Sequence, residues 1–222
     1  MKEARAKILE RRVVSFSCDD VVLEADLCLL REPAGIVVFA NASGSGRSSP
    51  RNRLVAEHLH KRGCATLLFD LLTIEEERGD MMSGRLRFDV SLLAKRLLRA
   101  VQWLDGQDET RNLQIGFFGS STGAAAALIA AAEVPERIGA IAIQRGRPDL
   151  APDALAWIEA PTLFLVGEHD RRVLLHNERA WDRIPASKKK LEIIPKATHL
   201  FEEPGAMETV AELASSWFAT HL

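Results

Sequence analysis

Residues Leu113–Ala127 read LQIGFFGSSTGAAAA and join a short apolar run to an alanine-rich stretch. The run Leu113–Phe118 has the length and composition of a buried β-strand. Glycines and small residues in GSSTG stand where the chain has to turn sharply, and the alanines that follow allow a helix to pack close to its neighbours. The stretch therefore predicts a strand, a tight turn and a helix in immediate succession.

Apolar runs alternate with helical patterns on both sides of this segment. The strand-like runs are Val13–Phe16, Val21–Leu30, Gly35–Ala40, Ala65–Leu71, Leu113–Phe118, Ile138–Ile143, Thr162–Val166 and Lys190–Ile194. Later runs such as GIVVFA and TLFLVG are continuous rather than alternating, which indicates strands buried on both faces of a parallel sheet. The first two runs have no helix between them, so we expect the sheet to begin with an antiparallel pair.

Helical patterns fill the intervals between the later runs. Ser49 and Pro50 are typical of a helix start, and Gly63 is typical of the position just past a helix end. Apolar residues also recur at helical spacing in Val90–Leu104 and in Met207–Phe218. The alternation predicts an α/β fold with right-handed crossovers in a single domain spanning residues 1–222. The highly charged stretch 73–87 is expected to be a solvated surface loop.

The composition excludes several classes of protein. The chain has 222 residues, 47% of them hydrophobic, and a formal net charge of −2, which predicts a folded globule and no nucleic-acid or membrane partner. No apolar run approaches the roughly 20 residues of a membrane helix, and no apolar segment of a secretory signal follows the N-terminus. The three cysteines, Cys18, Cys28 and Cys64, form no C-x-x-C pair, and we expect reduced thiols packed in strands of a cytoplasmic protein.

Ser121 lies at the centre of a G-x-S-x-G pattern, between a predicted strand and a predicted helix. This context predicts a serine whose hydroxyl projects from a tight turn as a nucleophile. The backbone N–H of Thr122, at the start of the helix, is then the first candidate donor to a developing oxyanion. The alternative interpretation is a turn that uses small residues only for packing.

A nucleophilic serine needs a base and an acid that orients it, in the chain order serine, acid, histidine on this architecture. Asp170 follows the run TLFLVG and His199 follows the run LEIIP, so these two residues are the candidates. Asp149 and Glu168 remain alternatives for the acid. The other histidines in or near helices are expected to be surface or capping residues; they are His58, His60, His176 and His221.

The segments GSSTG, GEHD and ATHLF, taken in this order, resemble the α/β-hydrolases. More narrowly, they resemble the dienelactone-hydrolase-like group, which includes a domain sometimes attached to phosphoribosyltransferases. The resemblance extends from about Gly35 to Leu222. It implies a mostly parallel sheet of seven to eight strands with helices on both faces and no large lid.

The sequence departs from this group at two positions. The named dienelactone hydrolases use a cysteine nucleophile, whereas this chain has Ser121. Family members usually carry His-Gly at the end of the third strand, whereas this chain has Asn41-Ala42. The resemblance implies a second oxyanion donor in the following loop, with the N–H of Ser43 as the best position. Asn41 and Arg145 are tentative substrate contacts, and for Arg145 a surface ion pair or loop anchor remains an alternative.

These residues predict a serine esterase that hydrolyses small or short-chain carboxylic esters through an acyl-enzyme. Alternatives are a thioesterase, peptidase or acyltransferase with the same triad, or a catalytically silent partner module, which Asn41-Ala42 favours. We expect no cofactor and no metal, because the chain has no paired histidines or cysteines at ligand spacing. Gly44 and Gly46 imitate a dinucleotide loop, but Ser49 replaces its third glycine. The oligomeric state is not indicated.

Overall fold

A computed structural model describes residues 7–41 and 46–222, and its centre is one eight-stranded sheet. The strands are β1 (Ile8–Cys18), β2 (Val21–Leu30), β3 (Ile36–Asn41), β4 (Ala65–Asp70), β5 (Ile115–Ser120), β6 (Ile138–Gln144), β7 (Thr162–Gly167) and β8 (Lys189–Ile194). Each predicted strand is present, and the largest change in length is at β1. That strand is longer because the charged residues before Val13 also pair with β2.

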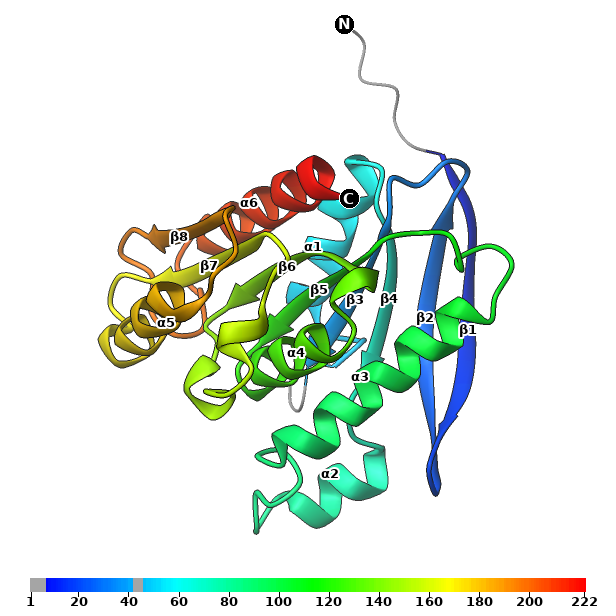
Figure 1. Ribbon diagram of the computed structural model, residues 1–222, viewed down its shortest axis with the longest axis horizontal. Helices are drawn as coiled ribbons and strands as arrows, with labels where there is room; N and C mark the ends of the chain where they lie inside the picture. The colour runs from blue at the N-terminus through cyan, green and yellow to red at the C-terminus, as the bar shows by residue number, and fades with distance from the viewer. Residues whose placement is uncertain (1–6, 42–45) are drawn as a thin grey trace, which may run out of the picture.

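The strand order in the sheet is β1-β2-β4-β3-β5-β6-β7-β8 (Figure 1). β2 pairs antiparallel with both β1 and β4, whereas β3 to β8 form parallel pairs, as the sequence predicts. The last residue of β3, Asn41, pairs with Ser120 of β5, which pairs with Gln144 of β6. The carboxyl ends of these strands therefore meet at one edge, where open α/β sheets place their sites.

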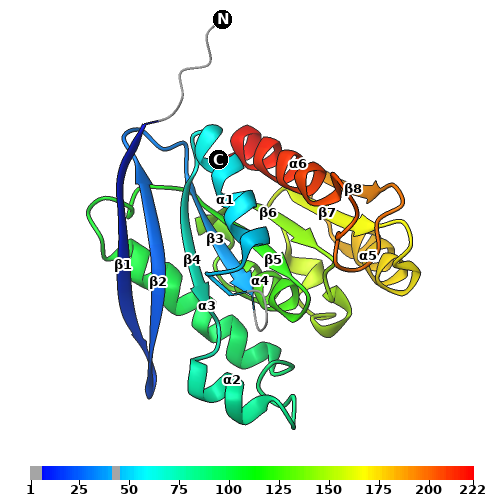
Figure 2. The same cartoon turned by 180° about the vertical axis from the view of Figure 1, so that it is seen from behind.

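Helices cover both faces of the sheet. α3 (Val90–Asp105), α4 (Thr122–Glu133) and α5 (Arg171–Arg183) lie on the face shown in Figure 1. α1 (Pro50–Lys61) and α6 (Ala206–His221) pack against each other on the opposite face (Figure 2). α1 begins and ends where Ser49, Pro50 and Gly63 predict. Gly63 has a φ of 88°, which a residue without a Cβ adopts at little cost.

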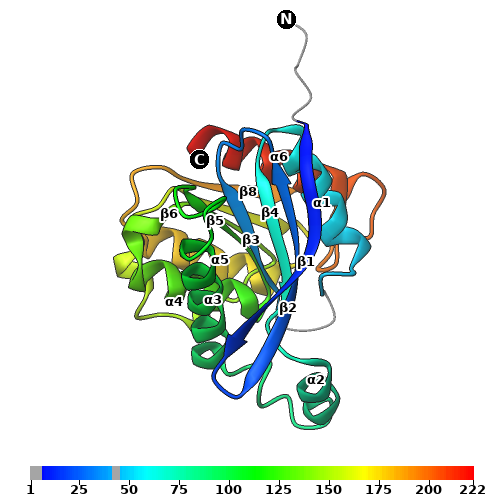
Figure 3. The ribbon, with the colours of Figure 1, turned by 90° about the vertical axis from the view of Figure 1, so that its right-hand side faces the viewer.

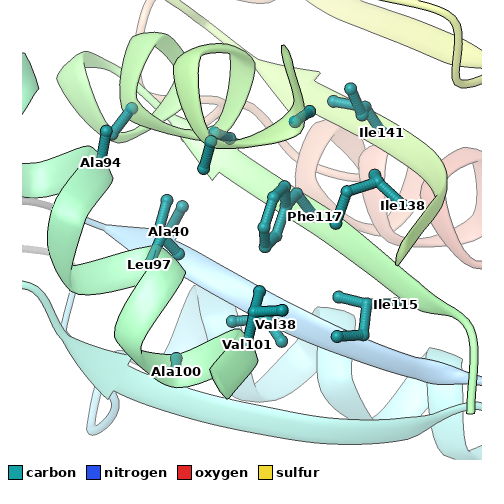
Figure 4. Close-up of a cluster of buried hydrophobic side chains, with 14 of the residues drawn as sticks. Val38, Ala40, Ala94, Leu97, Ala100, Val101, Ile115, Phe117, Ile138 and Ile141 are labelled. Carbon is teal, nitrogen blue, oxygen red and sulfur yellow. The ribbon is translucent and has the colours of Figure 1, made fainter. Parts of the chain in front are cut away.

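Two apolar cores result from these layers, one on each face of the sheet. On the α3 and α4 face, Leu97 and Val101 of α3 approach Val38 of β3, and Phe117 of β5 lies beside them (Figure 4). All four side chains are at most 2% exposed. Between β6 and β7 the chain makes only two short 3₁₀ turns, η2 (Pro148–Leu150) and η3 (Leu155–Trp157), so it has no large lid there.

The stretch 73–87 is largely exposed, as predicted, but the prediction that it is a loop is wrong. The stretch contains the helix α2 (Ile74–Asp80), which lies beyond the end of the sheet (Figure 3). Thr73 and Glu76 form a reciprocal capping box, and Glu76 also pairs with Arg96 of α3 at 2.5 Å. Asp80 is buried and accepts hydrogen bonds from Arg87. Paired charges thus fold this segment, which a count of charges does not indicate.

One histidine also departs from expectation. His60 is only 9% exposed, and its Nε2 lies 2.8 Å from the Thr66 hydroxyl on β4. It is therefore a buried residue of α1 and not a surface or capping histidine. The three cysteines are buried free thiols; Cys18 and Cys28 lie in strands, and Cys64 directly precedes β4.

Candidate active site

Ser121 occupies the single position between β5 and α4. Its backbone angles are φ 52° and ψ −127°, a left-handed conformation that a residue with a Cβ rarely adopts. The amide of Arg147 donates a 3.1 Å hydrogen bond to the Ser121 carbonyl and holds the turn from the side of β6. The turn is therefore strained and fixed, which is the geometry expected of a nucleophile elbow.

Two glycines make this turn sterically possible. A Cβ on Gly123 would lie 2.0 Å from the carbonyl oxygen of Ala40, and one on Gly119 would lie 2.8 Å from Cα of Ala124. α4 consequently starts in direct contact with the end of β3, and its four consecutive alanines from Ala124 are fully buried. The G-x-S-x-G pattern is thus required by close backbone approach on both sides of Ser121.

The start of α4 offers one backbone donor beside the serine. Thr122 is the first residue of the helix, so its N–H has no carbonyl four residues earlier within the helix to bond. Such an N–H, at the positive end of the helix dipole, is suited to a developing negative charge. The second predicted donor, Ser43, lies outside the described residues.

Asp170 and His199 are brought together from two different loops. Asp170 stands directly before α5, and His199 lies between β8 and α6. Their side chains meet at 2.5 Å between Oδ2 of Asp170 and Nδ1 of His199. The Asp170 side chain is 13% exposed and that of His199 is 46% exposed. The bond leaves Nε2 of His199 available, and among the described residues no hydrogen bond joins it to Ser121.

The two alternative acids have other partners. Burial raises the pKa of Asp149, but three hydrogen bonds from the Arg147 guanidinium outweigh it and lower the pKa. Glu168 is exposed and accepts the backbone N–H of Lys196 at 2.7 Å. Neither carboxylate contacts His199, so the geometry favours Asp170 as its partner.

The two tentative substrate contacts are both buried. Asn41 is 2% exposed, and its side-chain oxygen accepts a 2.7 Å hydrogen bond from the Ser120 hydroxyl. Arg145, just past β6, is 7% exposed. Burial and the charge of Arg51 lower its pKa, while the charge of Asp170 opposes that shift. Arg145 is thus buried and not on the surface, and the loop-anchor alternative for it stays open.

Sequence reasoning missed one residue that supports the histidine loop. Glu203 accepts hydrogen bonds from both the backbone N–H and the hydroxyl of Thr198, the residue before His199, at 3.0 and 2.5 Å. The acidic side chain five positions after a threonine was the available signal. In the described part of the chain, no cluster of three or more side chains has the arrangement of a metal site. Likewise, none of the described helices is long and apolar enough to cross a membrane.

A known protein family and several solved structures are similar to this chain. The model of the dienelactone hydrolase family matches residues 25–221. The chain belongs to the dienelactone hydrolase family. A crystal structure of dienelactone hydrolase from Anabaena variabilis is 51% identical, with a TM-score of 0.91 over 96% of this chain and 98% of that one. The esterase Est1E from Butyrivibrio proteoclasticus has a TM-score of 0.78 at 17% identity, covering 94% of this chain and 98% of its own, which shows a shared fold.

Sequence relatives of this dienelactone hydrolase family member include longer proteins. Two, from Mycobacterium tuberculosis strains CDC 1551 and H37Rv, are each provisionally named a phosphoribosyl transferase. They are 52% identical over 202 residues, which are 91% of this chain and 44% of each relative. The chain thus spans less than half the length of the proteins that carry that name. Family membership supports a hydrolase activity. It does not identify the substrate, which has to be inferred from the residues of the site.

Proposed function

We propose that this protein is a serine hydrolase of small or short-chain carboxylic esters, with Ser121 as nucleophile, His199 as base and Asp170 as orienting acid. The observation that carries the proposal is the 2.5 Å contact between Asp170 and Nδ1 of His199, at the sheet edge that also presents the strained Ser121. A carboxylate on Nδ1 fixes the tautomer in which Nε2 accepts a proton.

The proposed reaction has two halves. Nε2 of His199 takes the proton of the Ser121 hydroxyl while its oxygen attacks the ester carbonyl carbon. The tetrahedral oxyanion is stabilised by the N–H groups of Thr122 and Ser43, each worth about 3 kcal/mol. The carbon–oxygen bond to the alcohol then breaks, and His199 returns the proton to the departing oxygen. Water, deprotonated by His199, hydrolyses the acyl-enzyme in the same manner.

Substrate size follows from the absence of an insert between β6 and β7, because no segment there encloses a long acyl chain. Hydrolysis of p-nitrophenyl esters of increasing acyl length tests this point, and we expect turnover to decline beyond short chains. Strong activity on emulsified long-chain lipids contradicts it. The proposed mechanism needs no metal and no cofactor, so a chelator is expected to leave the rate unchanged. The three buried free thiols support a cytoplasmic location as part of the proposal.

A fluorophosphonate probe tests the nucleophile directly. We expect the native protein to be labelled at one serine and Ser121→Ala to remain unlabelled with unchanged thermal stability. Ser91→Ala is the matched control, because it removes an exposed hydroxyl on α3 and leaves Ser121 in place. A native protein that resists labelling supports instead a silent module, which the lack of a described hydrogen bond between Ser121 and His199 also favours. Thioester and peptide substrates in the same assay test the remaining alternatives.

A further inference from the structure

A cavity of about 300 Å³ lies between the β1–β2 hairpin and α1. This volume is at the lower end of the range of roughly 300–1,000 Å³ for small-molecule sites. Figure 2 shows the β1–β2 hairpin at the edge of the sheet opposite β7 and β8, with α1 packed beside β4. Neither Ser121 nor Asp170 nor His199 borders this cavity. It is lined by Arg11, Arg12, Val13, Asp26, Leu27, Cys28, Arg47, Arg53, Ala56, Glu57, His60, Thr66 and Leu68.

The inner wall of the cavity is apolar. Leu27 of β2, Ala56 of α1 and Leu68 of β4 are each at most 5% exposed and line it from three elements. Val13 of β1 adds an apolar side chain that is 65% exposed. A surface of this kind gains free energy when it covers a compact hydrocarbon or aromatic group, because apolar area leaves water. The occupant therefore needs an apolar body.

The polar part of the lining is cationic. Four arginines and two carboxylates, Asp26 and Glu57, line the cavity. Arg12 is paired with Glu10 and Glu109, and Arg47 is paired with Glu24. Asp26 is shared by Arg47 at 3.3 Å and Arg53 at 4.0 Å. Arg11 has no carboxylate within ion-pair distance among the described residues. A guanidinium in this position presents a planar set of donors that matches a carboxylate or a phosphate.

His60 lines the cavity as a buried polar group with incomplete hydrogen bonding. Its Nε2 contacts the Thr66 hydroxyl, whereas its Nδ1 has no partner among the described residues. Burial, with a smaller contribution from the Arg11 charge, lowers the pKa of His60 to about 4, so the ring is neutral near pH 7. His60 is therefore an uncharged polar group in the wall of the cavity, beside the arginines.

We propose that this cavity is a second binding site, separate from the serine site, for a small organic anion. Its ligand carries one carboxylate or phosphate head toward Arg11 and Arg53 and a compact apolar body against Leu27, Ala56 and Leu68. Binding at this site requires no reaction at Ser121. It can therefore be tested independently of the proposed esterase activity.

Calorimetric titration of the Ser121→Ala protein with four probes tests the site. Benzoate and phenyl phosphate carry both features of the ligand, benzyl alcohol lacks the charge, and inorganic phosphate lacks the apolar body. We expect the first two to bind with a dissociation constant on the order of 1 mM or tighter. The last two are expected to bind about tenfold more weakly, and the better of the first two identifies the preferred head group.

Variants locate the binding. Arg11→Gln combined with Arg53→Gln is expected to weaken benzoate and phenyl phosphate binding about tenfold or more, since charge-assisted hydrogen bonds are lost. Lys95→Gln, an exposed cation on α3, is the matched control and should change nothing. The His60 ring signals in ¹H–¹⁵N spectra should shift on saturation while those of His176 stay fixed. Equal affinity in the double variant, an unmoved His60, equal binding of benzyl alcohol, or no binding of any probe overturns the proposal.

Discussion

The side-chain oxygen of Asn41, the last residue of β3, accepts a 2.7 Å hydrogen bond from the hydroxyl of Ser120, the last residue of β5. The two residues are 79 positions apart in the sequence and paired in register on adjacent strands. Both are 2% exposed. The bond therefore joins the strand that precedes residues 42–45 to the strand that precedes Ser121, and it gives Asn41 a structural role beside the site.

Replacing either partner of this bond is expected to destabilise the fold. Asn41→Ala leaves the buried Ser120 hydroxyl without its acceptor, at a cost of about 1–3 kcal/mol in the free energy of unfolding. Ser120→Ala removes the donor and serves as the second single variant. In the double variant the two losses should not add, with a coupling of about 1 kcal/mol measured by urea denaturation. Strict additivity contradicts a direct interaction.

Removing the charge of Asp170 tests the acid. Asp170→Asn keeps the size of the side chain but no longer fixes the His199 tautomer, and we expect ester turnover to fall about 10⁴-fold. Asp149→Asn is the control, because Asp149 is held by Arg147 and does not touch His199. Its turnover should stay within about a factor of three of the native value. A larger loss in the Asp149 variant than in the Asp170 variant reverses the assignment.

Gly123 tests the steric requirement of the elbow. Gly123→Ala places a Cβ 2.0 Å from the Ala40 carbonyl oxygen, so α4 has to move away from β3. We expect a loss of stability of about 1–3 kcal/mol and loss of fluorophosphonate labelling. Gly79→Ala, inside α2, has nothing within 4 Å of the new Cβ and should be neutral or stabilising by up to about 1 kcal/mol. Thermal melts of both variants give the comparison.

The pair Glu76–Arg96 predicts a pH dependence of stability. Burial raises the pKa of Glu76, but hydrogen bonds from Arg96 and Thr73 outweigh it and hold the pKa below the ordinary value of 4.5. The contribution to stability is therefore complete above pH 4.5 and is lost as the pH falls through the lower folded-state value. Glu76→Gln should cost about 2 kcal/mol at pH 7, less than breaking a fully buried pair.

Acid titration of stability checks this prediction against a control. The difference in urea midpoint between the native protein and Glu76→Gln should shrink as the pH falls below 4.5. Glu75→Gln, also in the first turn of α2 but outside the pair, should behave like the native protein at every pH. A difference for Glu76→Gln that stays constant down to pH 3 would show that its carboxylate charge is not the cause.

The order of strands along the chain was predictable because each one is a short apolar run between helical patterns. The order across the sheet was not, because it depends on crossovers such as the one that places β4 between β2 and β3. The segment 73–87 was misjudged for a physical reason. Two of its carboxylates, those of Glu76 and Asp80, are paired with Arg96 and Arg87, and sequence composition does not record such pairing.

The candidate site also has some features that were predictable from the sequence and others that were not. Ser121, Asp170 and His199 were found because strand ends and chain order restrict where such residues can meet. The hydrogen bond between Ser120 and Asn41, the support of Thr198 by Glu203 and the burial of His60 were not found. The first depends on side chains that are 79 positions apart, which no local pattern encodes, whereas the second joins residues only five positions apart. The third depends on how α1 packs against β4.

The strained backbone of Ser121 also lowers the thermal stability of the whole protein. A side chain held at φ 52° costs on the order of 1–3 kcal/mol, and glycine adopts that conformation without the cost. Ser121→Gly should therefore melt at a higher temperature than the native protein while losing the proposed nucleophile. The free energy of unfolding of a domain is only about 5–15 kcal/mol, so the strained backbone of this one residue lowers it by an appreciable fraction. Thermal robustness alone would therefore favour glycine over serine at this position.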